Sequence, residues 1–177
     1  PGIQVIGPTT PDLPPVPGQL PIWSRDYEYV RHGTVSLLAG IDLATGEVTG
    51  LVRERHTSSE FIEFLQALDS KYPANVKIQV VLDNHSAHTS KQTFEYLATV
   101  PNRFEFVFTP VHGSWLNLIE SFFSKMTRQV LRNIQVKSKA ELAERIELYL
   151  REVNAHPVRF RWTHLTPLAM ANHIGVS

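Results

Sequence analysis

Hydrophobic and polar positions alternate in the first third of the chain, which is the pattern of half-buried β-strands. The alternation covers residues 27–30 and 34–42, and it returns over residues 47–52 after the turn residues 44–46 (Ala-Thr-Gly). Two apolar runs that flank a short turn with glycine are typical of an antiparallel hairpin. We therefore predict three strands here, the last two joined as a hairpin.

The middle of the chain alternates between helical and strand patterns. Residues 57–60 (Thr-Ser-Ser-Glu) have the sequence of a helix capping box, and apolar residues follow at helical spacing over residues 61–68. Residues 76–82 are apolar and β-branched enough for a buried strand. A short helix over residues 91–98 then leads to a strand over residues 104–108.

Two long amphipathic helices are predicted in the last third. Apolar residues recur at intervals of three and four over residues 115–130. Residues 138–141 (Ser-Lys-Ala-Glu) form a second capping box, and an apolar stripe runs over residues 142–153. A hairpin followed by strand–helix alternation predicts an α/β domain, with a mixed sheet flanked by helices. An RNase H-like (ribonuclease H) sheet has this order of elements.

Length and composition indicate one globular domain. The 177 residues suffice for a single core. Residues 1–26 hold seven of the 12 prolines, which predicts an extended surface segment of the same domain rather than an element, with residues 27–177 as the folded body. The absence of cysteine excludes disulfides and thiolate metal sites. No targeting or membrane segment is visible, so we expect a cytoplasmic protein without membrane contact.

Charge is polarised along the chain. Residues 1–100 carry seven Lys and Arg against eleven Asp and Glu, a balance of −4, and residues 101–177 carry ten against six, a balance of +4. Any affinity for nucleic acid must therefore reside on one face or in another segment.

Asp83 is the first candidate for chemistry, because it ends a buried strand at a polar loop, where α/β sheets place ligands. An aspartate in that position is also a common turn former, as is its neighbour Asn84. Asp42 likewise ends an apolar strand, but its Asp-x-x-Thr-Gly context predicts hairpin-turn chemistry rather than catalysis.

Glu120 is the second candidate, because apolar residues surround it on nearly every side of its predicted helix. Such a carboxylate needs a partner, and Asn117 lies on the same face. The plainer interpretation is a glutamate at the border of the stripe, bonded to a nearby Lys or Arg. Asp83 and Glu120 together could bind Mg²⁺ or Mn²⁺, which take oxygen ligands, although two-metal centres normally use three or more acidic residues.

Two other features have competing interpretations. Asp83, His85, His88 and His112 offer ligand types that zinc accepts, but the histidines fall in a loop, and supporting or surface roles are favoured. After Glu120 comes a basic streak that fits either a DNA backbone or a solvated helix face. The streak consists of Lys125, Arg128, Arg132, Lys137 and Lys139.

Residues 81–88 (Val-Leu-Asp-Asn-His-Ser-Ala-His) and 109–120 (Thr-Pro-Val-His-Gly-Ser-Trp-Leu-Asn-Leu-Ile-Glu) closely resemble insertion-sequence transposases of the mariner superfamily. The family's second catalytic aspartate corresponds to Asp83 and its glutamate to Glu120. Residues 29–34, the Asp42 hairpin, residues 56–65 and Trp162-Thr163 are also similar, so the resemblance covers nearly the whole chain.

The resemblance implies an RNase H-like fold, Mg²⁺ or Mn²⁺, and cleavage and joining of DNA by a homodimer or higher oligomer that holds two element ends. The family's first aspartate lies in an Asp-Glu pair just before a segment like residues 1–4. That pair is not in this sequence, and neither is the family's N-terminal helix-turn-helix. We therefore expect the chain to start after one metal ligand and much of the first strand, and to be inactive alone.

Our hypothesis is a DDE transposase catalytic domain that acts on DNA in the bacterial cytoplasm at the nucleoid. Asp83 and Glu120 bind the metal. Asn84, His88 and Asn117 support the site, and Lys125, Arg128 and Arg132 contact DNA. The alternatives are a catalytically inactive RNase H-like module that binds DNA or protein, and a metal-dependent nuclease without strand transfer.

Overall fold

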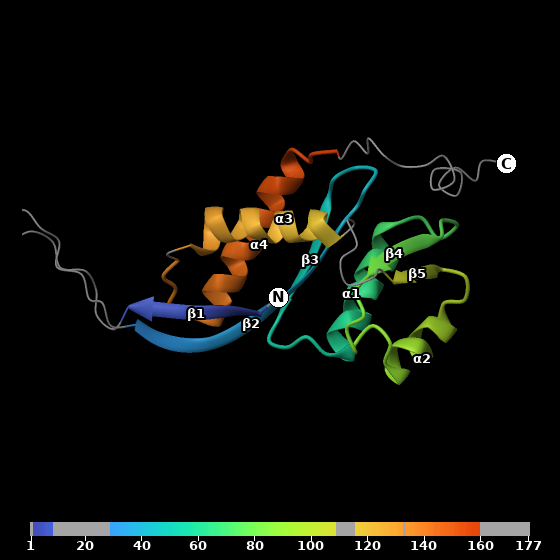
Figure 1. The fold of residues 1–177 in the computed structure, drawn as a ribbon, viewed down its shortest axis with the longest axis horizontal. Coiled ribbons are helices and arrows are strands. Elements are labelled where there is room, and N and C mark those ends of the chain that lie inside the picture. Colours follow the sequence, from blue (N-terminus) through green and yellow to red (C-terminus); the bar gives the residue numbers. More distant parts are fainter. Residues whose placement is uncertain (1, 9–28, 109–115, 133, 160–177) are drawn as a thin grey trace, which may run out of the picture.

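The computed structural model describes residues 2–8, 29–108, 116–132 and 134–159 (Figure 1). None of the helices in these ranges is both long and apolar enough to cross a membrane. In chain order the elements are β1 (Gly2–Pro8), β2 (Tyr29–Ile41), β3 (Val48–Arg53), α1 (Ser58–Lys71), β4 (Ile78–Leu82), α2 (Lys91–Thr99), β5 (Phe104–Phe108), α3 (Leu116–Met126), the π-helical turn η1 (Thr127–Leu131) and α4 (Lys139–Ala155).

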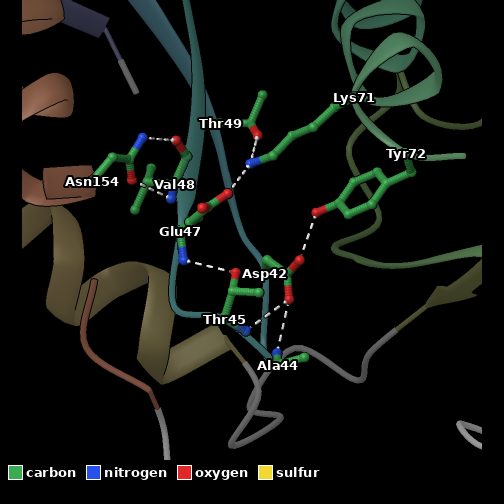
Figure 2. A network of polar contacts seen from close by, with 9 residues as sticks. All are labelled: Asp42, Ala44, Thr45, Glu47, Val48, Thr49, Lys71, Tyr72 and Asn154. Atoms are coloured by element: carbon green, nitrogen blue, oxygen red, sulfur yellow. Dashed lines mark hydrogen bonds and ion pairs between the residues drawn. The ribbon is translucent and has the colours of Figure 1, made fainter. Parts of the chain in front are cut away.

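The first three strands form one antiparallel sheet in the order β1-β2-β3. β2 pairs with β3 from Ser36 opposite Arg53 to Ile41 opposite Val48, which confirms the predicted hairpin. Asn154 of α4 reinforces the start of β3 (Figure 2): its Nδ2 donates to the Val48 carbonyl at 2.8 Å, and its Oδ1 accepts the Val48 N–H at 2.8 Å.

β1 was not expected, because the sequence analysis placed no element in residues 1–26. That prediction was wrong for residues 2–8, which pair with the first half of β2. The same pairing makes residues 29–41 one strand, where two were predicted. The register between β1 and β2 shifts between Val5 and Ile6, and Val5 lies opposite Gly33. β2 continues through this irregularity because Gly33 takes a φ of 105°, a conformation that glycine adopts without strain.

β4 and β5 form a separate parallel pair, from Ile78 opposite Phe104 to Leu82 opposite Phe108. The helix α2 connects them, as a parallel pair requires. Within the described ranges, no backbone pairing joins this pair to the three-stranded sheet. Figure 1 shows β4, β5 and α2 beside α1, on the opposite side of the molecule from β1.

β2 contributes to the core on both of its faces, because successive side chains of a strand point in opposite directions. Val35 and Leu37 pack in a cluster with residues of α3 and α4, whereas Leu38 packs with α1. Helices therefore cover both faces of the first sheet. The predicted α/β class is confirmed, while the described strands form an antiparallel sheet and a separate parallel pair in place of the one mixed sheet that was predicted.

A helix begins at each predicted capping box, and the box is complete at α1, whereas Glu141 at α4 accepts the N–H of Lys137 instead of that of Ser138. Thr57 accepts the Ser59 N–H at 3.3 Å while Glu60 accepts the Thr57 N–H at 2.8 Å, at the start of α1. Ser138 accepts the Glu141 N–H at 3.1 Å, at the start of α4. These local hydrogen bonds satisfy backbone donors that a helix leaves free at its first turn.

The C-terminal end of α1 is held by Arg103, which lies in the connection between α2 and β5. Arg103 is 7% exposed. Its guanidinium donates to the backbone carbonyls of Asp69 at 2.9 Å, Tyr72 at 2.7 Å and Pro73 at 2.6 Å, and to that of Val76, and it forms an ion pair with the Asp69 carboxylate at 2.6 Å. A buried charge with this many acceptors is fully compensated.

Asp42 closes the hairpin turn, as predicted (Figure 2). Its Oδ1 accepts the backbone N–H groups of Ala44 at 2.8 Å and Thr45 at 3.1 Å, and its Oδ2 accepts the Tyr72 hydroxyl at 2.8 Å. Burial alone would raise the pKa of this carboxyl, but the hydrogen bonds from Tyr72 and the turn outweigh burial, and the pKa is lowered. Asp42 is therefore an ionised, structurally engaged carboxylate.

Candidate metal and DNA site

Asp83 lies directly after β4, at the carboxyl end of a parallel strand, and its side chain is 57% exposed. Its Oδ1 accepts the His85 backbone N–H at 3.1 Å. His88 Nδ1 lies 3.0 Å from both Oδ1 and the backbone oxygen of Asp83, and because both are acceptors, this nitrogen carries a proton and donates. Among the described residues, Asp83 Oδ2 has no hydrogen-bond partner.

The loop from Asp83 to α2 is anchored although its tip is exposed. Thr93 is fully buried, and its hydroxyl donates to the Ala87 carbonyl at 2.7 Å. The Ser90 hydroxyl accepts the Thr93 N–H at 3.2 Å, which caps α2. The buried His88 ring packs on Phe61 of α1, with ring centres 4.4 Å apart. The loop therefore presents Asp83 from a packed base.

Three histidines converge beside Asp83. His56, in the connection from β3 to α1, and His85 and His88, in the loop after β4, have ligand nitrogens within 4.8 Å of one another. The rings of His56 and His85 are stacked, with centroids 4.6 Å apart and planes inclined by 8°. In the described ranges this is the one cluster of three or more potential metal ligands.

His56 is partly buried. Its Nε2 is buried and has no hydrogen-bond partner. Burial lowers the pKa of His56, and proximity to the other two imidazoles lowers it further. The ring is therefore neutral at pH 7, with a lone pair available on one nitrogen.

Glu120 lies in α3 and is exposed, which differs from the expectation of a carboxylate hemmed in by apolar neighbours. It lines an open hollow with Ser121, Ser124 and Arg128. Residues 120, 124 and 128 are spaced by one helical turn each, so this polar row occupies the side of the helix opposite the buried Phe122 and Met126.

Basic side chains continue along this region. Lys125, Arg128 and Arg132 are all exposed, and none forms an ion pair with a described acidic residue. Lys139, by contrast, pairs with Glu54 at 2.9 Å. The first three cations are free to contact an anionic ligand.

The predicted residues are thus placed in two groups. Asp83 and His88 are in direct contact, and Asn84 is exposed beside them. Glu120 and the basic residues are on α3 and just beyond it, and neither Asp83 nor Glu120 belongs to the cluster of three ligands. The side chain of Asn117 and all of His112 lie outside the described residues.

The sequence analysis missed His56. The signal was its place in the residues 56–65 that share the family resemblance, immediately before a capping box. Nothing in the local pattern brings it to His85 and His88, which lie beyond α1 and β4 along the chain.

A family of known proteins matches most of the chain. Residues 16–143 match the family described as DDE superfamily endonuclease. The chain is 26% identical over 121 residues to a curated protein of Shigella sonnei, the insertion element IS630 uncharacterized 39 kDa protein. The alignment covers 68% of this chain and 35% of that protein, so the chain spans about a third of the length of this relative.

Two solved structures are similar in backbone. The Mos1 mariner paired end complex with Mn has a TM-score of 0.50 and 17% identity, over 85% of this chain and 47% of that one. The simian T-cell lymphotropic virus intasome in complex with PP2A regulatory subunit B56 gamma has a TM-score of 0.45 and 14% identity, over 75% and 53%. The Mos1 likeness shows the fold alone, and the predicted RNase H-like fold is confirmed.

Proposed function

Because the chain belongs to the DDE superfamily endonuclease family, we propose that it is the catalytic domain of a transposase that cuts and joins DNA with divalent metal ions. The resemblance to insertion-sequence transposases of the mariner superfamily is confirmed by the family match and the insertion-element relative. One observation supports the proposal most directly: Asp83 offers an exposed carboxylate from a packed loop at the end of a parallel strand.

Asp83 and Glu120 are the proposed metal ligands. Both are exposed, and Asp83 Oδ2 is unengaged among the described residues, so the donor chemistry suits hard cations such as Mg²⁺ or Mn²⁺. Such ions, when bound, activate the attacking water or hydroxyl and stabilise the leaving oxygen of a phosphodiester. The Mos1 paired end complex is a complex with Mn, a cation of this same class.

The neighbouring residues have supporting roles in this proposal. His88 donates to Asp83 Oδ1 and to the Asp83 backbone, which orients the carboxylate so that Oδ2 points away from the bond. Asn84 and Asn117 contribute polar groups that position the substrate.

DNA would lie along α3 and η1. Arg128 shares the hollow of Glu120, so a phosphate bound by its guanidinium would sit next to the proposed metal ligand. Lys125 and Arg132 extend this contact along the backbone. We propose that transposon ends and target DNA bind here, in a homodimer or higher oligomer acting in the bacterial cytoplasm at the nucleoid.

The test is Mn²⁺-dependent nicking of supercoiled plasmid by this chain and by a form extended upstream through the Asp-Glu pair that the family resemblance predicts. We expect activity in the extended form, lowered at least about 100-fold by Asp83→Asn or Glu120→Gln, because each removes a metal-binding charge. Glu144→Gln, which alters an exposed carboxylate of α4, is the matched control and leaves nicking unchanged.

A second assay asks whether cut ends are joined to a target plasmid. Joining by the extended form supports the proposed transposase activity. Cutting without joining would indicate a nuclease that lacks strand transfer. Binding of DNA without any cutting would contradict the proposed enzymatic activity and favour a DNA-binding module.

A further inference from the structure

We propose that His56, His85 and His88 bind a transition-metal ion of the Zn²⁺ type, at a site distinct from the carboxylate ligands of the proposed function. The inference rests on the histidine geometry and holds whether or not the chain cuts DNA. It joins two connections that are far apart in sequence, the one before α1 and the one after β4.

The spacing of the three rings suits one ion. Their ligand nitrogens lie within 4.8 Å of one another. Tetrahedral zinc with Zn–N bonds of about 2.0–2.1 Å places its nitrogen ligands roughly 3.3 Å apart. Small side-chain rotations therefore suffice to bring the nitrogens into coordination, and the backbone can stay as it is.

His88 is already oriented as a ligand. Its Nδ1–H donates to Asp83, which leaves Nε2 as the nitrogen available to a metal ion. A carboxylate behind the far nitrogen is the usual arrangement around metal-binding histidines, because it fixes the tautomer and strengthens the bond to the metal. The ring is also held in place by its packing on Phe61.

His56 supplies a nitrogen with no other role among the described residues. Its buried Nε2 lacks a hydrogen-bond partner, which is unfavourable for a polar atom removed from water. Coordination of a cation would satisfy that atom.

His85 completes the set from the exposed side. Its Nδ1 accepts the Ala87 N–H at a long 3.2 Å, so this nitrogen carries a lone pair, and binding a metal ion through Nδ1 would replace this hydrogen bond with a metal bond. Because His85 faces solvent, the fourth coordination position would hold water.

Imidazole nitrogens select the class of ion. They suit Zn²⁺ and neighbouring transition metals, whereas Mg²⁺ prefers oxygen ligands. The ion would hold the Asp83 loop against the start of α1, so the site would stiffen the position of Asp83 through His88.

The first experiment titrates tag-free, metal-stripped protein with Zn²⁺ by calorimetry and follows Co²⁺ substitution by visible absorption. We expect one Zn²⁺ per chain, a tetrahedral Co²⁺ spectrum, and no displacement by millimolar Mg²⁺. His85→Asn and His56→Gln should each weaken Zn²⁺ binding at least about 100-fold, beyond the 10–100-fold typical of losing a supporting contact, and Asp83→Ala about 10-fold. Circular dichroism establishes that each variant is folded.

The matched control is His156→Asn, which removes an exposed histidine at the end of α4. It should bind Zn²⁺ as the parent does, and so should Glu120→Gln. The proposal is overturned if the parent binds no Zn²⁺ more tightly than Mg²⁺, or if His56→Gln and His85→Asn bind it as the parent does. If the parent binds Zn²⁺ but the extended form never nicks DNA, this site stands and only the proposed enzymatic function is refuted.

Discussion

Asp42 and Asp83 each follow an apolar strand, yet their carboxylates meet different surroundings. Asp42 uses both oxygens: Oδ1 accepts two backbone N–H groups of the turn, and Oδ2 accepts the Tyr72 hydroxyl. Asp83 uses Oδ1 for His85 and His88, while Oδ2 has no described partner on a side chain that is 57% exposed. Both oxygens of the Asp42 carboxylate therefore accept hydrogen bonds within the fold, whereas the Asp83 carboxylate is held through one oxygen and keeps the other available.

The difference shows how a structural aspartate can be told from a candidate metal ligand. A carboxylate with two oxygens and about four acceptor sites can either complete a turn or leave sites for a cation. The oxygens of Asp42 accept hydrogen bonds from the turn backbone and from the Tyr72 hydroxyl. In Asp83 the anchoring comes from His88 and the loop base, so the exposed oxygen is positioned without being occupied.

The largest expected contrast is in metal binding. Asp83→Ala should weaken Mn²⁺ binding by roughly 100-fold, because it removes a charged oxygen ligand, whereas Asp42→Ala should leave it within a factor of two. Electron paramagnetic resonance titration of free Mn²⁺ measures both, in a His85→Asn background that removes the imidazole site. Equal losses in the two variants would contradict the distinction.

Stability should show the reverse order. Asp42→Ala should lower the free energy of unfolding by about 2 kcal/mol, because three hydrogen bonds to a charged group are lost. Asp83→Ala should lower it by less than about 1 kcal/mol, since its side chain is mostly exposed. Urea denaturation of both variants and the parent provides the comparison. A greater loss of unfolding free energy in Asp83→Ala than in Asp42→Ala would contradict this prediction.

The stabilisation by Asp42 should depend on pH. Its pKa in the folded protein is lowered below the ordinary value of 3.8, so the contribution is complete above that value and is lost as pH falls through the folded pKa. The difference in unfolding free energy between the parent and Asp42→Asn should therefore shrink on acidification below about pH 4. A difference that grows in acid would reverse the inferred direction of the shift.

A smaller effect than that of Asp42→Ala is expected from Tyr72→Phe. Removal of one hydroxyl should lower the unfolding free energy by about 1 kcal/mol, because Asp42 keeps its turn hydrogen bonds. The pKa of Asp42 should move back toward its ordinary value, which flattens the pH dependence above. Thermal unfolding at pH 3 and pH 7 would reveal both changes, and Thr99→Ala, at an exposed helix end, serves as the control.

Local patterns predicted most elements correctly. The hairpin, the helix starts at Thr57 and Ser138, the strand over residues 104–108 and the turn formed by Asp42 each depend on residues within a few positions of one another. Local sequence is therefore enough to predict them. The exposure of Glu120 could also have been foreseen, because Ser124 and Arg128 follow it at intervals of four and continue a polar row.

From residue 29 onward the sequence by itself determined the order of helices and strands, and it also determined the class of the fold and, through its motifs, the family. Only the tertiary structure decided that residues 2–8 form a strand, that Arg103 caps α1, and that His56 meets His85 and His88. Each of these joins segments separated by dozens of residues. Whether these segments meet depends on how the sheet and helices pack, and the local periodicity of the sequence does not specify that packing.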